Sequence, residues 1–165
     1  MTEDINLIPA IDTYIKHFSR NGWPILATRD WHPPNHCSFA EQGGVHPTHC
    51  VQGSRGAQFH TDLVMPPGMM VISKGTDAKK DAGSGFEGSS LADRLEDLDV
   101  KTVFILGPAT QDCLKQTIMD ACKLGLQVII LKDAIGTETS ADTFKEIFQT
   151  EAMQATASDL GIKPT

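Results

Sequence analysis

The chain has 165 residues, of which 40% are hydrophobic, and a formal net charge of −7. This size and apolar content predict a single domain over residues 1–165, large enough to bury a core without disulfide staples. The negative charge and the lack of a Lys/Arg cluster argue against a nucleic-acid partner. Four cysteines in a chain of this length do not suggest a disulfide framework, so we expect a reducing, cytoplasmic setting. No apolar run approaches membrane-spanning length, so no membrane partner is expected.

The first half of the chain predicts one helix and two short strands. Apolar residues recur at helical spacing over residues 6–20, and Gly22 is placed to end that helix. Residues 23–29 are typical of a short strand that leads into a loop rich in polar and ligand-type side chains. A second short strand is expected at residues 69–73, ending at Lys74.

The second half alternates helices and strands. Ser89 or Ser90 can cap a helix that carries Leu91, Leu95 and Leu98 on one face. Residues 100–106 and 126–131 are apolar runs typical of strands covered on both faces. Further elements are expected as a helix over residues 111–124, a helix capped by Ser140 and a short strand near residues 153–157. The alternation predicts an α/β fold with three layers, in which a mostly parallel sheet is flanked by helices.

The densest group of metal-ligand side chains lies in residues 29–50, RDWHPPNHCSFAEQGGVHPTHC. Carboxylate and neutral imidazole suit a borderline divalent ion such as zinc or iron. Asp30 and His32 are two positions apart at a predicted strand end, so extended backbone would point both to the same side. His49 could fold back as a third ligand and leave a coordination position open for water or substrate.

Two other interpretations of this loop remain open. Its histidines could be ordinary polar surface residues, although their density disfavours this. A closed structural zinc site could instead use His36, Cys37, His49 and Cys50, although their spacing does not match the usual Cys-x2-4-Cys pairs.

A candidate nucleophile lies farther along the chain. Cys113 is near the start of a predicted helix, where backbone N–H groups favour a thiolate, and a nearby Lys74 would lower the thiol pKa further. Ligands of parallel sheets bind at the carboxyl ends of the strands, so the ligand loop, Lys74 and Cys113 should converge on one edge. The alternatives are a buried, inert thiol, which we assign to Cys122, and a solvated loop lysine at position 74.

Five segments resemble the nicotinamidase/pyrazinamidase branch of the isochorismatase-like cysteine hydrolases. They are TRDWHPPNHCSF (28–39), HCVQGSRGAQFH (49–60), SKG with SGF (73–86), LGPATQDC (106–113) and LKDA (131–134). The resemblance implies an amidohydrolase that converts nicotinamide, pyrazinamide or a similar small aromatic amide to the acid and ammonia through a cysteine thioester. It also implies a role in NAD salvage.

The resemblance also implies roles for individual residues. Cys113 would be the nucleophile, Lys74 the catalytic lysine, and the N–H groups of Ala109 and Cys113 the oxyanion hole, beside a cis Pro108–Ala109 bond. A divalent metal is implied, zinc ahead of iron or manganese, with ligands Asp30, His32 and His49 and, as in some members, His36. The implied partners are a small-molecule amide and further copies of the chain.

One family feature has no counterpart in this sequence. The family begins with a strand ending in Asp-x-Gln-x-Asp-Phe, whose first Asp is the general base, and that strand is normally central in the sheet. Its loss would remove the base and expose two strand edges. Either the chain is shortened at its start, or it is a divergent member in which the gap is closed or filled by a partner chain. Asp112 is a weak substitute, because consecutive helix residues do not face one another. A catalytically impaired metal-binding homologue is therefore the alternative function, and a structural zinc fold is a third.

Overall fold

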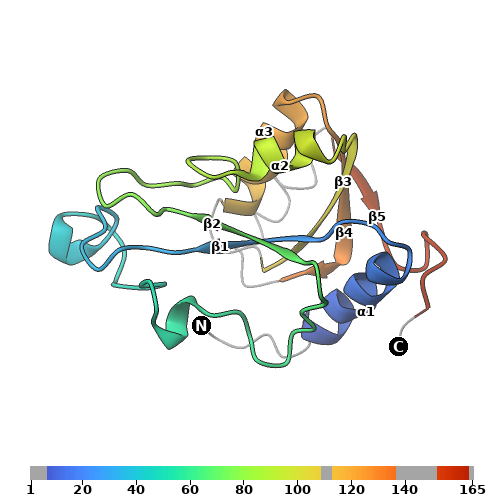
Figure 1. The fold of residues 1–165 in the computed structure, drawn as a ribbon, viewed down its shortest axis with the longest axis horizontal. Helices are drawn as coiled ribbons and strands as arrows, with labels where there is room; N and C mark the ends of the chain where they lie inside the picture. The colour runs from blue at the N-terminus through green and yellow to red at the C-terminus, as the bar shows by residue number, and fades with distance from the viewer. Residues whose placement is uncertain (1–6, 109–112, 137–151, 164–165) are drawn as a thin grey trace.

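The computed structural model describes residues 7–108, 113–136 and 152–163 (Figure 1). Within these ranges the helices and strands are α1 (Leu7–Arg20), β1 (Leu26–Asp30), β2 (Met70–Lys74), α2 (Leu91–Asp97), β3 (Thr102–Gly107), α3 (Cys113–Lys123), β4 (Gln127–Ile135) and β5 (Met153–Ala155). Two short 3-10 helices, η1 (Ala40–Gln42) and η2 (Arg55–Ala57), lie in the long loop between β1 and β2. The predicted alternation of helices and strands is confirmed. The helix predicted after Ser140, Asp112 and the oxyanion-hole residue Ala109 lie outside the described residues.

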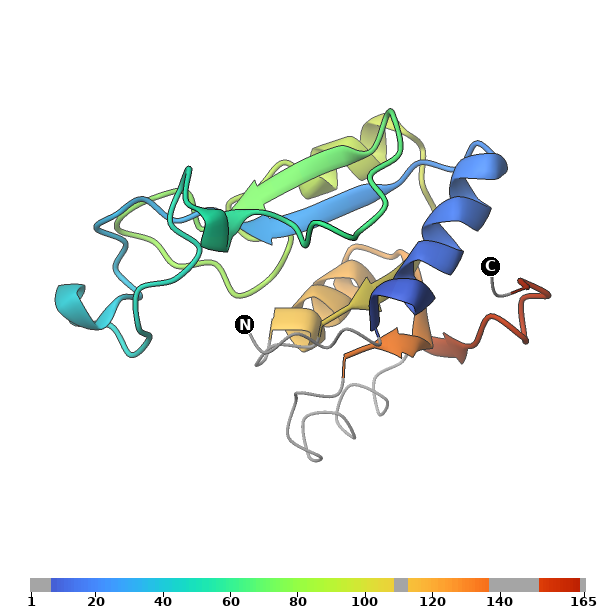
Figure 2. The same cartoon turned by 90° about the horizontal axis from the view of Figure 1, so that it is seen from below.

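The described strands form two parallel sheets. β1 pairs with β2 in one sheet, and β3, β4 and β5 form the other in that order. Figures 1 and 2 show the two groups of strands separately, with the long loop after β1 extending to one end of the molecule. In the described ranges no ladder joins β1 to β3, so each has one unpaired edge.

Helix α1 packs on the second sheet and on the residues that precede both strands of the first. Its buried side chains contact Phe104 of β3 and Leu131 of β4, and Ile25 and Met69, which precede β1 and β2, pack against the same cluster. Figure 2 shows α1 crossing beside the space between the two groups of strands. The core residues that α1 supplies are Leu7, Ile11, Tyr14, Ile15 and Phe18. Each buried aliphatic side chain contributes roughly 1.5–3 kcal/mol, so α1 is a main link between the sheets.

The other two helices pack on different parts of the molecule. Leu91 and Leu95 of α2 pack with Ile72 of β2 and contact Val103 of β3, so α2 also connects the two sheets. Helix α3 packs on the second sheet through its buried residues Leu114, Ile118 and Ala121. Leu98 follows the end of α2 and is 43% exposed, so it does not extend the buried face. No helix in the described part of the chain is long and apolar enough to cross a membrane.

Strand β3 is less covered than its sequence predicted. Residues 102–106 are only partly buried along the whole strand, whereas Val128, Ile130 and Leu131 of the neighbouring β4 are 3% exposed or less. The prediction of a strand covered on both faces is therefore wrong for β3 and holds for this part of β4. Among the described residues β3 pairs with β4 alone, so its other edge is left open.

A carboxylate ties α1 to β4 and to the C-terminal segment. The Tyr14 hydroxyl donates to Asp133 Oδ1 at 2.5 Å, and the Ala157 N–H donates to Asp133 Oδ2 at 3.0 Å. Burial and this carboxylate raise the pKa of Tyr14, which keeps the phenol protonated as a donor. Asp133 therefore has the geometry of a structural residue.

Replacing Tyr14 with phenylalanine should lower the free energy of unfolding by about 1–2 kcal/mol, because it removes one hydrogen bond to a charged acceptor and leaves the ring packed. Urea unfolding measures the change. Thr102→Val is the control, since it removes the exposed Thr102–Gln127 hydrogen bond and should stay within about 0.5 kcal/mol of the parent chain. Equal effects of the two changes would contradict the proposed clamp.

Candidate active site

Two of the predicted functional residues are paired across the first sheet. Asp30 ends β1 and Lys74 ends β2, and the parallel register places their Cα atoms opposite one another. Lys74 Nζ lies 2.5 Å from Asp30 Oδ1, and Lys74 is only 5% exposed. The sequence placed both residues at strand ends, but it did not predict that they pair. The sequence feature that could have indicated the pairing is that each residue is the last of a short predicted strand.

Lys74 also reaches the candidate nucleophile. Its ammonium donates to the carbonyl of Ala82 at 2.7 Å and hydrogen-bonds the Cys113 thiol. Burial opposes the charge on Lys74, but the Cys113 sulfur in its thiolate form and the Asp30 carboxylate outweigh burial, so the pKa of Lys74 is raised. The lysine is therefore a buried cation, and the alternative of a solvated loop lysine is excluded. It connects the end of β1 to the start of α3.

The carboxylate of Asp30 has an unused acceptor position. Oδ1 is buried and has no hydrogen-bond donor among the described residues, although Lys74 Nζ is close to it. The ammonium therefore acts on this oxygen as the charged partner of an ion pair. A buried oxygen of this kind is rare in proteins unless another group completes it. Asp30 Oδ1 is therefore a suitable ligand atom for a cation.

The ring of His32 is oriented toward Asp30. His32 Nδ1 lies 2.9 Å from the carbonyl oxygen of Gly75, which can only accept, so Nδ1 carries the proton. The other nitrogen, Nε2, is 4.0 Å from Asp30 Oδ1. Burial lowers the pKa of His32, so the ring is neutral. Neutral imidazole with an available Nε2 is the form that binds metal ions.

His49 repeats this arrangement. Its ring centroid is 4.9 Å from that of His32, and its Nδ1 lies 2.8 Å from the carbonyl oxygen of Pro47. The backbone carbonyl again holds the Nδ1 proton and leaves Nε2 as the acceptor. Metal-binding histidines usually donate their second ring N–H to a carbonyl or carboxylate in this way.

His36 is bound differently. Its ring stacks on His32 with centroids 4.1 Å apart, and its Nδ1 accepts from the backbone N–H of Ser38 at 3.3 Å. Its Nε2 lies 3.3 Å from the carbonyl oxygen of Lys80. Both nitrogens are engaged, so His36 supports the His32 ring in this arrangement. Its role as an additional ligand, which remains a prediction, requires one of these bonds to break.

The donor set of Asp30, His32 and His49 fits a divalent ion in its chemistry, with one buried carboxylate oxygen and two imidazoles whose Nδ1 atoms face backbone carbonyls. As the side chains stand, no three His, Cys, Asp or Glu residues in the described ranges are arranged to hold an ion. The same finding applies to the alternative closed set of His36, Cys37, His49 and Cys50, all of which are described.

Cys113 is the first described residue of α3. Burial raises the pKa of its thiol, and the Lys74 ammonium opposes this shift only in part. The prediction of a lowered thiol pKa is therefore wrong for this arrangement, because the sequence did not reveal how far the sulfur is removed from water. The predicted position beside Lys74 is where the structure places it.

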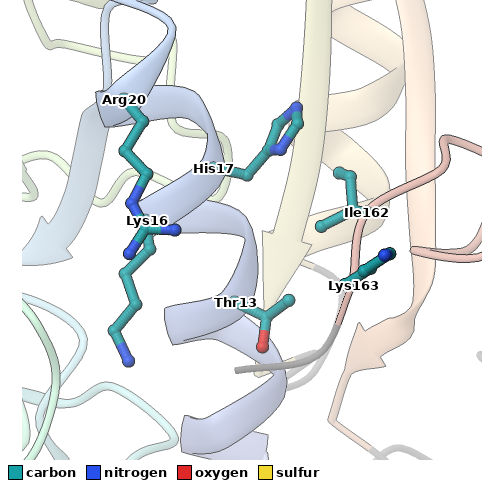
Figure 3. Close-up of a pocket in the computed structure, with 6 residues that line it drawn as sticks. All are labelled: Thr13, Lys16, His17, Arg20, Ile162 and Lys163. Carbon is teal, nitrogen blue, oxygen red and sulfur yellow. The ribbon is translucent and has the colours of Figure 1, made fainter.

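A separate hollow lies between α1 and the C-terminal segment (Figure 3). It is lined by Thr13, Lys16, His17, Arg20, Ile162 and Lys163, and none of these belongs to the cluster around Lys74. In Figure 3 the side chains of Lys16 and Arg20 run along one side of α1, away from Ile162 and Lys163. The cations do not converge on a common point, so we do not place the chemistry there.

The chain matches known proteins over most of its length. Residues 1–160 match the isochorismatase domain. The nicotinamidase of Escherichia coli is 34% identical over 164 residues, covering 84% of this chain and 77% of that protein. The nicotinamidase/pyrazinamidase of Mycobacterium tuberculosis is 37% identical over 127 residues, covering 72% of this chain and 67% of that protein.

Solved structures give the same result. The pyrazinamidase of Pyrococcus horikoshii in complex with zinc has a TM-score of 0.84 and 39% identity, covering 92% of this chain and 85% of that one. PnC1 of L. infantum in complex with nicotinate has a TM-score of 0.81 and 31% identity, with coverages of 96% and 83%. The α/β fold and the family expected from the five sequence segments are confirmed, and the chain belongs to the isochorismatase-like family of hydrolases.

Proposed function

We propose that this chain hydrolyses the carboxamide of nicotinamide, pyrazinamide or a similar small aromatic amide to the acid and ammonia. The main support is the buried network in which Lys74 contacts both the Cys113 thiol and the Asp30 carboxylate. Further support comes from the similar E. coli and M. tuberculosis proteins, which are a nicotinamidase and a nicotinamidase/pyrazinamidase. The L. infantum relative binds nicotinate, the acid product of this reaction.

The proposed reaction proceeds through a thioester. The Cys113 thiol first gives its proton to solvent water. The sulfur then attacks the carboxamide carbon, and the C=O electron pair moves onto oxygen. When the carbonyl reforms, the C–N bond breaks and the nitrogen leaves with an added proton as ammonia. Water then hydrolyses the thioester to release the acid and restore the thiol. The N–H groups of Cys113 and Ala109 are the predicted oxyanion hole.

Lys74 has two proposed roles in these steps. Its charge stabilises the thiolate, because it lowers the thiol pKa against the effect of burial. It is also the proton donor placed beside the sulfur, and so a source of the proton that the leaving nitrogen needs. Lys74 cannot serve as the initial base while it is charged.

A metal completes the proposed site. Asp30, His32 and His49 would hold a divalent ion, with zinc first because the P. horikoshii relative binds it, and with iron or manganese as alternatives. A bound ion supplies positive charge and an open coordination position for a substrate atom. The cytoplasmic setting, the role in NAD salvage and the homo-oligomer remain predictions.

One observation favours a second candidate function, a metal-binding homologue with impaired catalysis. The hydrogen-bond partners of the Cys113 thiol among the described residues are Lys74 and Thr117, and neither is a carboxylate. Thr117 gives its hydroxyl proton to the Cys113 carbonyl at 2.8 Å. No base for the thiol is therefore apparent in the described part of the chain.

Cys113→Ala should reduce ammonia release from nicotinamide by at least about 1,000-fold, because it removes the atom that forms the thioester. A coupled ammonia assay measures the rate. Cys122→Ala is the matched control, since it changes a thiol on the same helix outside the site and should keep the parental rate. Equal rates for the parent chain and Cys113→Ala would exclude the cysteine mechanism.

His49→Gln should weaken zinc binding by at least about 10-fold, because it removes a ligand nitrogen and leaves the Lys74–Cys113 contact in place. Competition with a chromogenic chelator measures the affinity. Gln58→Ala, an exposed position in the same loop, is the control and should bind zinc as the parent chain does. If His49→Gln unfolds in thermal denaturation instead, the structural zinc fold is the better explanation.

Alkylation of Cys113 by iodoacetamide should have its midpoint above pH 9, because burial raises the thiol pKa above its ordinary value of 9.0. Lys74→Met should move the midpoint to still higher pH, since the ammonium favours the thiolate. Mass spectrometry of the peptide that carries Cys113 follows the reaction. The exposed Lys79→Met is the control and should not shift the midpoint. A midpoint well below pH 9 in the metal-free chain would contradict the effect of burial.

A further inference from the structure

We propose that Gly75 is the positioning residue for His32, through its carbonyl oxygen and through its lack of a side chain. The proposal rests on the proposed function in that His32 is taken as a metal ligand. Gly75 directly follows Lys74, at the end of β2, and its carbonyl accepts the His32 Nδ1 proton at 2.9 Å. Gly75 therefore contacts the ring at the nitrogen that does not face Asp30.

Only glycine suits this position, for two independent reasons. The backbone of Gly75 has φ +60°, which residues with a side chain rarely adopt. A Cβ atom at this position would lie 2.4 Å from His32 Cε1 and 2.6 Å from His32 Nδ1, well inside van der Waals contact. Any side chain would therefore push the imidazole away from its present position.

The carbonyl of Gly75 also selects the tautomer. A neutral imidazole carries one proton, and the Gly75 oxygen holds it on Nδ1. The lone pair is then on Nε2, the nitrogen 4.0 Å from the unsatisfied oxygen of Asp30. The opposite tautomer would present an N–H at that point, and an N–H cannot bind a cation. Gly75 thus determines whether His32 is a ligand.

The His32 ring is confined from a second direction. His36 stacks on it at 4.1 Å and is itself fixed by Ser38 and by the carbonyl of Lys80. The imidazole is therefore held by the Gly75 backbone and by a ring that is already immobilised. Because Gly75 follows Lys74 in the chain, one backbone segment positions both the His32 ring and the ammonium that contacts Cys113.

The first test requires no substitution. In the metal-free protein, long-range 1H–15N NMR of the histidine rings should show His32 protonated on Nδ1 and unprotonated on Nε2, with His32→Gln used to assign its signals. A His32 ring protonated on Nε2 would overturn the proposal. The result does not depend on hydrolysis, so a chain that fails to release ammonia from nicotinamide would refute the proposed function alone.

The second test compares two glycines with the same backbone angle. Gly88 also has φ +60°, but a Cβ there would meet no atom within 4 Å. Gly75→Ala and Gly88→Ala therefore share the backbone strain, and only Gly75→Ala displaces His32. Gly75→Ala should weaken zinc binding about 10- to 100-fold and change the His32 ring signals, whereas Gly88→Ala should change neither.

Equal zinc affinity of Gly75→Ala and Gly88→Ala would overturn the proposal, as would His32 ring signals unchanged in Gly75→Ala. If Gly75→Ala does not fold, the tautomer measured in the parent chain decides the question. Signals of His17 serve as an internal reference, because this ring lies on α1 against Phe18 and Trp23 and should be unaffected.

Discussion

The buried ion pair between Lys74 and Asp30 is the interaction on which the site depends. The pair joins the ends of two adjacent parallel strands. Lys74 Nζ can come this close to Asp30 Oδ1 because the strand register places the two residues opposite each other. Burial would normally disfavour the ammonium, and the thiol and carboxylate beside it reverse that preference. One cation thereby holds together a candidate ligand and a candidate nucleophile that are 83 positions apart in the chain.

The fold supports this pair through helices that bridge two sheets. α2 contacts residues of both sheets, and α1 packs on the second sheet and on the residues that precede β1 and β2. The ends of β1 and β2 are thereby held near the start of α3, although no ladder joins β1 to β3 in the described residues. Packing of apolar side chains therefore holds the two sheets together, as backbone hydrogen bonds would in a continuous sheet. The partly exposed β3 is the visible consequence.

The chemistry of the site is a balance between exclusion of water and local charge. Burial favours the neutral forms of His32 and Cys113, which suits a metal ligand and opposes a nucleophile. Lys74 counteracts burial at the sulfur only in part. A group that accepts the thiol proton is therefore the requirement that separates an efficient hydrolase from a metal-binding homologue of the same family.

The sequence by itself determined the elements, the family and the residue types of the site. The apolar spacing of α1, the alternation of strands and helices, and the closeness of Asp30 to His32 depend on neighbours in the chain, which a sequence displays. Only the tertiary structure decided that Lys74 pairs with Asp30, that Gly75 holds the Nδ1 proton of His32, and that the thiol pKa is raised. These properties depend on distances between segments far apart in the chain and on how far packing excludes water from each group. A local sequence pattern contains neither kind of information.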